Sequence, residues 1–352
     1  VTARNGINVV TNGINIQAGI LTAKDIIDAS NAQRNTRVGT NAGNSFDGTN
    51  AEDNTLIGYD AGTAITTGDK SVAVGNYALD AVTTVGSHTA IGYQSLSANT
   101  TGQQQTGVGA YALAGNTTGT QNVAIGWGAI NANTTGDYNV ALGFAAMYNG
   151  SGGGSANIAI GRYSLYENTT GSANICAGAN TLQNNTTGSN NVAVGGNALQ
   201  TNTTGATNTA VGKNALNDNT TADDNTAVGH NALTSNTTGY SNTAVGQDAL
   251  TTLTDGIRCV AVGQDALKAC TGNRNTGLGW QAGLSLTSGA QNTFVGSNSA
   301  SSATTGNYNT ALGDSALGTC TTGANNTAVG KSALAAQTTA DENTAIGYNA
   351  GV

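Results

Sequence analysis

The segment "NTTGYSNTAVGQDAL" (Asn236–Leu250) decides the fold, because most of the chain repeats it. In the preceding repeat the same frame reads "NTTADDNTAVGHNAL", starting at Asn219. The glycine that closes each AVG-like triplet recurs 19 times between Gly39 and Gly347, and 15 of the 18 intervals are 17 residues long. This period is too short for a pair of helices. It predicts an all-β fold, a parallel β-solenoid of about 19 coils.

The amino-acid composition fits a chain whose backbone is hydrogen-bonded throughout. The 352 residues include 51 glycines and no proline, and only 9% are charged and 5% aromatic. Proline cannot donate a backbone hydrogen bond, so continuous ladders exclude it. A chain this polar can be disordered. Its regularly spaced Val, Ile and Leu residues indicate a repeated core instead.

Charge and hydropathy argue against two classes of partner. The formal net charge is −8 and the pI is about 4.5. No basic patch suits a phosphate backbone, so the sequence predicts no nucleic-acid binding. No apolar run approaches the ~20 residues of a membrane-spanning helix, so it also predicts no membrane span.

The "NTAVG" stretch has the alternation of a β-strand. Thr243 and Val245 occupy positions where Thr and β-branched residues replace one another, and we expect both to face the inside of the coil. Ala244 would then face outward. Ala249 and Leu250 cannot both face inward on an extended backbone, so the pattern predicts apolar stripes along the outside. Identical chains would bury such stripes, most simply as a homotrimer. The alternative is a wide monomeric solenoid in which the backbone curls and turns both residues inward.

Two further positions of the repeat indicate interior contacts. The residue that opens the strand is Asn in 15 of 19 repeats. Side-chain amides stacked at ~4.8 Å can hydrogen-bond along the stack, which predicts a stabilising ladder and not a ligand site. The Leu of "AL" is replaced by glycine at Gly43, Gly62 and Gly283. Each time a large apolar residue follows three positions later, which predicts one pocket filled from either position: Phe46, Ile65 and Leu286.

The repeat divides the chain into two parts. The period covers residues 35–352, which form the predicted repeat shaft. Residues 1–34 lack the period but contain an echo of their own, "NGINVV" at Asn5 and "NGINIQ" at Asn12. Because the terminal units of stacked repeats need a different surface, we expect this segment to be a β cap or connector.

The "NTAVGxxAL" and "NTTG" elements resemble those of phage tail-fibre proteins and related bacterial surface proteins. "SVAVG" at Ser71 and "NVAIG" at Asn122 are also similar to the head repeats of trimeric autotransporter adhesins. The resemblance covers residues 35–352 and implies a left-handed parallel β-roll that assembles as a homotrimer. The adhesin repeats are shorter and less uniform, and no coiled-coil stalk, membrane anchor or chaperone domain is recognised in this sequence. The carrier, a phage or a cell, is therefore left open.

The sequence contains no pattern typical of an active site. The two histidines, His88 and His230, occupy different positions of the repeat, eight coils apart. They cannot assemble a Ser-His-Asp triad or a zinc site. The closest acidic groups are Asp223–Asp224 and Asp341–Glu342, where a weak cation site is conceivable. We expect no enzymatic activity, no cofactor and no bound metal.

The cysteines are placed by the register of the repeat. Cys270 and Cys320 share a position but lie three coils apart, and Cys176 lies five coils from Cys259. Disulfides require Cα atoms within ~7 Å, so four buried thiols without an intrachain disulfide are expected.

Candidate recognition residues lie in the variable pair that follows each marker glycine. This pair holds most of the aromatic residues, which suit stacking on sugars or on apolar receptor patches. The alternative, which we weight more heavily, is that these rings stiffen a corner or fill gaps between chains. The candidates for surface recognition are Tyr59, Tyr93, Trp127, Phe144, Tyr163, Trp280 and Tyr348.

The sequence thus predicts a structural fibre protein, the rigid trimeric shaft of a phage tail fibre that takes part in attachment to a host surface. Its expected partners are copies of itself, other fibre or baseplate proteins, and a glycan or protein receptor on the host cell. Its expected location is the virion or the extracellular cell surface. A bacterial adhesin or extracellular filament subunit is the main alternative. An ice-binding protein, argued against by inward-facing Thr residues, and a polysaccharide-degrading spike are weaker ones.

Overall fold

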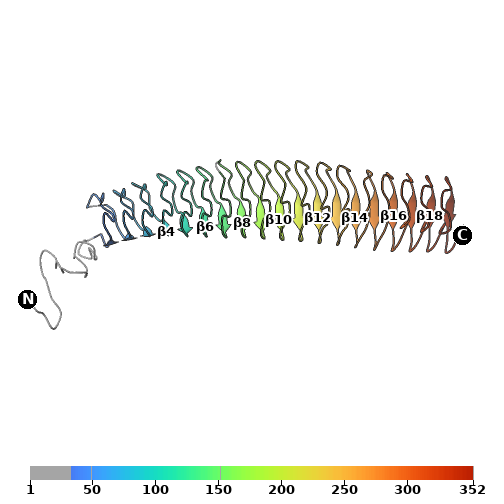
Figure 1. The fold of residues 1–352 in the computed structure, drawn as a ribbon, viewed down its shortest axis with the longest axis horizontal. Coiled ribbons are helices and arrows are strands. Elements are labelled where there is room, and N and C mark those ends of the chain that lie inside the picture. The colour runs from blue at the N-terminus through green and yellow to red at the C-terminus, as the bar shows by residue number, and fades with distance from the viewer. Residues whose placement is uncertain (1–32, 49, 151, 352) are drawn as a thin grey trace, which may run out of the picture. The chain divides into compact units, whose positions relative to one another are not determined.

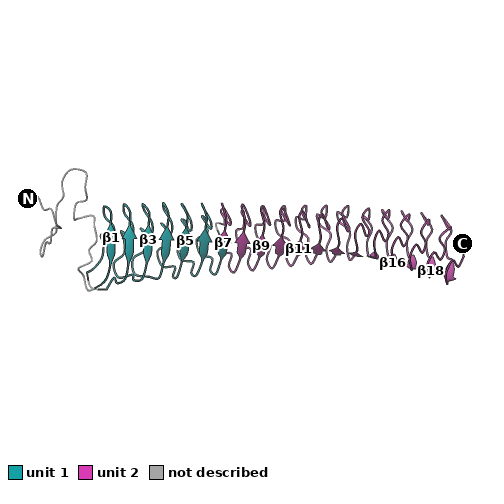
Figure 2. Cartoon of the chain, turned by 90° about the horizontal axis from the view of Figure 1, so that it is seen from below, with its two compact units in different colours: residues 1–141 teal, residues 142–352 magenta. Residues whose placement is uncertain are grey.

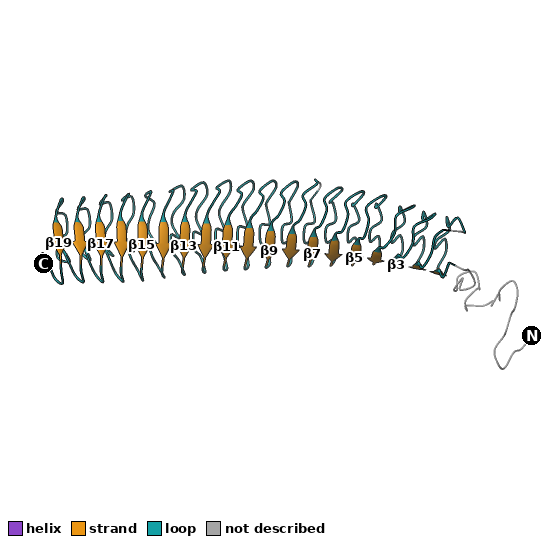
Figure 3. Ribbon diagram, turned by 180° about the vertical axis from the view of Figure 1, so that it is seen from behind, coloured by secondary structure: helices purple, strands orange, loops and turns teal. Residues whose placement is uncertain are grey.

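The computed structural model describes residues 33–351, apart from residues 49 and 151. The cap or connector expected at residues 1–34 falls almost entirely outside the described residues. The chain divides into two compact units, Val1–Ala141 and Leu142–Val352 (Figure 2). Each described unit is built from parallel β-solenoid coils, and the described residues contain no helix (Figure 3).

Each coil contributes one three-residue strand, and the remainder of the coil consists of turns and bends (Figure 1). Within the first unit, neighbouring strands from β1 to β6 pair in parallel and in register. The strands of this unit are β1 (Thr36–Val38), β2 (Thr55–Ile57), β3 (Val72–Val74), β4 (Thr89–Ile91), β5 (Thr106–Val108) and β6 (Val123–Ile125). The division between the units falls within β7 (Val140–Leu142).

The second unit continues the same pattern. Neighbouring strands from β8 to β19 pair in parallel and in register. The strands are β8 (Ile158–Ile160), β9 (Ile175–Ala177), β10 (Val192–Val194), β11 (Thr209–Val211), β12 (Thr226–Val228), β13 (Thr243–Val245), β14 (Val260–Val262), β15 (Thr276–Leu278), β16 (Thr293–Val295), β17 (Thr310–Leu312), β18 (Thr327–Val329) and β19 (Thr344–Ile346). The predicted solenoid with a 17-residue period is therefore confirmed.

We number the positions of a coil from 1 to 17, so that Asn236 is position 1 and Thr252 is position 17. The marker glycine at position 11, such as Gly246, adopts a φ of 134°. A Cβ on Gly246 would lie 2.5 Å from the carbonyl oxygen of Gly263 in the next coil. Glycine recurs at this position because the backbones of successive coils meet there too closely for any side chain.

The strands face the opposite way from the orientation that the sequence predicted. Ala244, at position 9, is fully buried, whereas Thr243 and Val245 are partly exposed. The interior of the coil is narrow, and one small side chain from each strand fills it. The β-branched residues at positions 8 and 10 therefore form the outer face of the sheet. The expectation that Thr and Val face inward is wrong.

The "AL" pair turns entirely into the core. Ala249 and Leu250 are both fully buried. This is possible because the backbone curls rather than extends: Asp248 has a φ of 56° and Leu250 a φ of 52°, in the left-handed region. The curl is the backbone conformation that the alternative of a wide solenoid required, with both residues turned inward. It also removes the "AL" residues from any exposed stripe, so within the described coils the outward apolar stripe comes from the strand.

Two asparagine ladders line the interior, and the one at position 7, where the strand opens, is the ladder that was predicted. The Oδ1 of Asn225, at position 7, accepts a hydrogen bond of 3.0 Å from the backbone N–H of Asn242 in the next coil. A second ladder runs through position 1, where Asn236 donates from Nδ2 to Oδ1 of Asn219 at 3.0 Å. Both sets of side chains are almost completely buried. Their amides satisfy backbone groups that no strand partner reaches.

The pocket predicted from the glycine substitutions exists, but a third position helps to fill it. A Cβ on Gly62 would lie 2.9 Å from Ile65, as expected, and also 2.8 Å from Leu56 at position 9. At Gly283 the space is filled by Leu267 and by Phe294, another position-9 residue. A large residue in the middle of a strand thus occupies the volume left by a missing leucine.

Candidate recognition surface

The outer face of the sheet is uncharged in both units. Position 10 carries Val, Ile, Leu or Ala in every strand, and position 8 carries Thr, Val or Ile. In the first unit, Ile91 is 39% exposed and Ile125 is 40% exposed. In the second unit, Ile160 and Leu312 are likewise exposed. Aliphatic side chains therefore line one face of each unit, coil after coil, where water could contact them.

An aromatic ladder borders this face in the first unit. It consists of Tyr59, Tyr77, Tyr93, Tyr111 and Trp127, which alternate between positions 12 and 13 of successive coils. Neighbouring ring centroids lie 5.4 to 6.1 Å apart and meet edge to face. This geometry is favourable for the ring quadrupoles and fixes the orientation of each ring.

The ladder has an exposed row and a half-buried row. The position-12 rings, Tyr59, Tyr93 and Trp127, are each 42 to 44% exposed. The position-13 rings, Tyr77 and Tyr111, are half-buried between them. Three predicted recognition residues are therefore brought together, with one exposed ring in every second coil. The two supporting tyrosines were absent from the predicted set, although they belong to the same variable pair.

The predicted residues of the second unit lie in two places. The rings of Phe144 and Tyr163 are 5.6 Å apart, and the guanidinium of Arg162 lies 5.0 Å from the centroid of Tyr163. Trp280 and Tyr348 are also exposed, but four coils separate them. Ser297, Asp314 and Lys331 occupy position 12 of the intervening coils. The structure therefore does not bring Trp280 and Tyr348 into one strip.

Two aromatic residues outside the variable pair were missed. Tyr148 and Tyr166 both occupy position 16 of their coils, and their rings stack with centroids 5.6 Å apart and planes 6° apart. Tyr166 also meets Tyr163 edge to face at 5.3 Å. The recurrence of tyrosine at one position in adjacent repeats is the signal that would have identified this pair.

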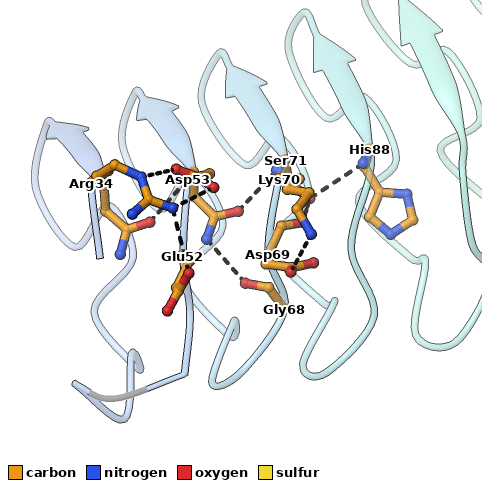
Figure 4. Close-up of polar contacts among 10 residues, drawn as sticks. Arg34, Glu52, Asp53, Gly68, Asp69, Lys70, Ser71 and His88 are labelled. Carbon is orange, nitrogen blue, oxygen red and sulfur yellow. Dashed lines mark hydrogen bonds and ion pairs between the residues drawn. The ribbon is translucent and has the colours of Figure 1, made fainter. Parts of the chain in front are cut away.

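His88 replaces an asparagine of the position-7 ladder and is 1% exposed. Its backbone N–H donates to Oγ of Ser71 at 3.3 Å (Figure 4). Its Nδ1 accepts from the backbone N–H of Gln105 at 3.4 Å. Its Nε2 is buried without a hydrogen-bond partner. Burial lowers the pKa of His88 from 6.5 to about 4. The neutral ring therefore takes the place of an asparagine side chain in the ladder.

Two of the acidic residues accept hydrogen bonds from the backbone of a neighbouring coil. Oδ1 of Asp223 accepts from the backbone N–H of Ala206 at 2.7 Å, and Asp341 does the same for Ala324. Arg34 pairs with Asp53 at 2.6 Å on the exposed surface of the first described coil (Figure 4). Among the described residues, no group of three His, Cys, Asp or Glu side chains is arranged to hold a metal ion.

The cysteines, a search for membrane-spanning helices and comparisons with known proteins give few further indications of function. All four cysteines are buried, as predicted, and each is a free thiol in this structure. None of the described segments forms an apolar helix long enough to span a membrane. No protein-family model matches the sequence, and the search of curated proteins finds no relative. Support for the candidate surface therefore comes from its geometry alone.

Proposed function

We propose that this chain is the shaft of a homotrimeric extracellular fibre, of the kind found in phage tail fibres, that takes part in attachment to a host surface. The observation that carries the proposal is the uncharged outer face formed by positions 8 and 10. Water-exposed aliphatic rows of this extent mark an association surface. A closed ring of identical chains buries the same face on every subunit, and a threefold arrangement meets this need around one axis.

The composition of the face suits an interface between copies of one chain. It contains no charge that a subunit would have to desolvate. The parallel register also repeats the same side chains along the sheet, so identical neighbours can interdigitate at every coil. A bacterial adhesin or extracellular filament subunit would use the same architecture, and both carriers place the protein outside the cell, on a virion or a cell surface.

The solution mass tests this proposal. Light scattering or sedimentation of the full chain is expected to give three times the chain mass of 34.7 kDa. The double substitution Val194→Glu and Val211→Glu introduces charge on the outer face, where both residues are about one-third exposed in a single chain. It is expected to lower the mass to that of the monomer, because burying unpaired carboxylates is strongly unfavourable.

A matched control separates the interface from general surface charge. Thr187→Glu combined with Thr204→Glu places the same two charges on exposed corners of the same unit, and this variant is expected to keep the trimer mass. A wild-type chain that sediments as a clean monomer would refute the trimeric shaft.

We place the host contact on the aromatic ladder. Rings exposed in every second coil and fixed by edge-to-face neighbours offer a stiff stacking surface for a glycan or an apolar receptor patch. Binding measured on a glycan array, or on host cells once they are known, should weaken when Tyr93 and Trp127 are both replaced by Ala. A matched change at Trp280, which lies outside the ladder, should leave binding intact.

The observed strand orientation favours one second candidate, an ice-binding protein. The Thr residues of position 8 face outward in a regular array. The sequence predicted that they face inward, which argued against ice binding, and the observed orientation removes this objection. Thr276, Thr293, Thr310, Thr327 and Thr344 follow one another without interruption. A trimer would bury this array, so thermal hysteresis by a monomeric chain would favour ice binding, and its absence in a trimer would favour the fibre.

A further inference from the structure

Cys259 and Cys270 occupy two different positions of the repeat that converge inside the solenoid. Cys259 is at position 7 and Cys270 at position 1 of the following coil. In an ordinary pair of coils both positions are Asn and both amides donate to one carbonyl. Nδ2 of Asn225 lies 2.9 Å from the carbonyl oxygen of Gly239, and Nδ2 of Asn236 lies 2.8 Å from the same atom.

The two cysteines keep this convergence. Sγ of Cys259 lies 3.2 Å, and Sγ of Cys270 3.5 Å, from the carbonyl oxygen of Gly272. Both side chains are completely buried. The side chain of Cys270 also lowers the pKa of the Cys259 thiol. The two sulfurs are therefore neighbours in the core, in contact with the same oxygen.

The other cysteines lack such a partner position. Cys320 also occupies position 1, but the converging residue is Asn309, whose Nδ2 donates to the carbonyl of Gly323 at 2.8 Å. Cys176 lies within strand β9. Cysteine thus replaces both amides of one junction, and only at this junction among the described coils.

The corner at this junction is also unusual. The interval between Gly263 and Gly279 is 16 residues, the shortest in the repeat array. The corner sequence is shortened there from the usual "NTTG" to "CTG". The junction therefore combines a deletion with the loss of two amide donors, which are replaced by thiols that donate only weakly. A covalent link would hold the two coils together at this altered junction.

We propose that Cys259 and Cys270 form a disulfide under oxidising conditions, and that this bond staples the coil of β14 to the coil of β15. The oxidant is a small disulfide such as oxidised glutathione. The Cys259 thiolate attacks one sulfur of the oxidant and releases one thiolate. The Cys270 thiolate then attacks the Cys259 sulfur, forms the internal bond and releases the second. The pair loses two electrons, and its two protons pass to the released thiols.

The staple revises the expectation of four free thiols drawn from the sequence. That expectation compared cysteines only at corresponding positions of the repeat or at large coil separations. The two positions that converge, 7 and 1, are different positions of the repeat and lie 11 residues apart in the chain, so that comparison missed them. An extracellular fibre would meet the oxidising conditions in which such bonds persist.

Tryptic mapping tests the staple directly. The full chain is unfolded and refolded in a glutathione redox buffer, which gives the oxidant access to both buried thiols, and is then alkylated and digested. Trypsin cleaves after Arg258, Lys268 and Arg274, so the cysteines fall in the separate peptides 259–268 and 269–274. We expect these peptides to be recovered joined, lighter than their sum by two hydrogen atoms, and to separate on reduction. Thiol titration should fall from four groups to two.

Control variants keep the test decisive. Cys259→Asn and Cys270→Asn restore the residue usual at each position, so both chains should fold and lose the joined peptide. Cys176→Ser should retain it. Recovery of both wild-type peptides with alkylated free thiols, or joined to Cys176 or Cys320, would overturn the proposal.

Discussion

At the residue scale, His88 shows how a single substitution in a buried ladder couples stability to pH. The folded pKa of about 4 lies below the ordinary value of 6.5. Between these values the unfolded chain binds a proton that the folded chain does not. Stability therefore rises with pH through this window and is lost as the pH falls from 6.5 towards 4.

We predict that His88→Asn stabilises the protein at low pH. A shift of this size corresponds to about 3 kcal/mol that the wild type loses below pH 4. Asparagine carries no such penalty, and its Nδ2 can donate to the carbonyl of Gly102, as Asn122 does to Gly136 at 2.8 Å. Thermal melts between pH 4 and pH 7 should show a flatter pH dependence in the variant.

The second histidine provides the control for this prediction. His230 is exposed at position 12, so His230→Asn should leave the pH profile as it is in the wild type. An unchanged acid slope in His88→Asn would show that burial of this ring does not govern acid stability.

At the element scale, a strand exchanges volume with the curl of its own coil or of the preceding coil. Phe294 is fully buried in β16, where most strands carry Ala, and it fills space beside Gly283. Gly283 and Ala300 both stand at position 15, where leucine is usual. The strand and the curl are therefore complementary parts of one packing layer.

We predict that Phe294→Ala costs about 3–5 kcal/mol in the free energy of unfolding, because it leaves a cavity in a close-packed interior. Gly283→Leu alone should also destabilise, since a Cβ there would lie 2.8 Å from the Phe294 ring. The double variant restores the ordinary Ala and Leu pair. Its loss in the free energy of unfolding should be smaller than the sum of the losses in the two single variants. Denaturant titration of all four chains in a double-mutant cycle measures this difference.

The backbone at Gly283 makes this rescue feasible. Its φ of 61° is close to the 51° at which Leu199 and Leu216 sit in the left-handed region. Strictly additive costs in the cycle would show that the strand and curl residues do not share one pocket.

At the scale of the whole molecule, each described coil bonds chiefly to the coils before and after it. Leu199, for example, donates its backbone N–H to the carbonyl of Ala215 in the next coil at 3.0 Å. Stability in such an array is approximately a sum of coil terms and terms between neighbouring coils. A local defect is therefore expected to stay local.

We predict that Leu199→Ala, which opens a cavity at a fully buried position, raises hydrogen exchange near β10 and β11 without affecting β3 and β4 in the other unit. The expected cost is about 2–5 kcal/mol. Hydrogen-exchange mass spectrometry resolves this pattern. Asp218→Ala, an exposed change in the same region, should leave exchange unaltered. Uniform loss of protection in both units would contradict the local picture.

The sequence alone determined the period, the strand positions and the buried Asn ladder at position 7. Each of these follows from residue types that recur at one spacing. It also placed the aromatic candidates in the variable pair, although it could not select the five that meet in the ladder, because ring contact depends on how adjacent coils superpose.

Only the tertiary structure decided which face of the strand is inside. In "TAV" the alternation states that Ala244 faces opposite to Thr243 and Val245, but it is equally consistent with either side being the core. The left-handed residues Asp248 and Leu250 curl the chain so that "AL" occupies the interior. The space left in the interior opposite "AL" then usually fits only a small side chain at position 9 of the strand, such as Ala244. The same closure brings Cys259 beside Cys270, since it joins positions that are remote within the repeat.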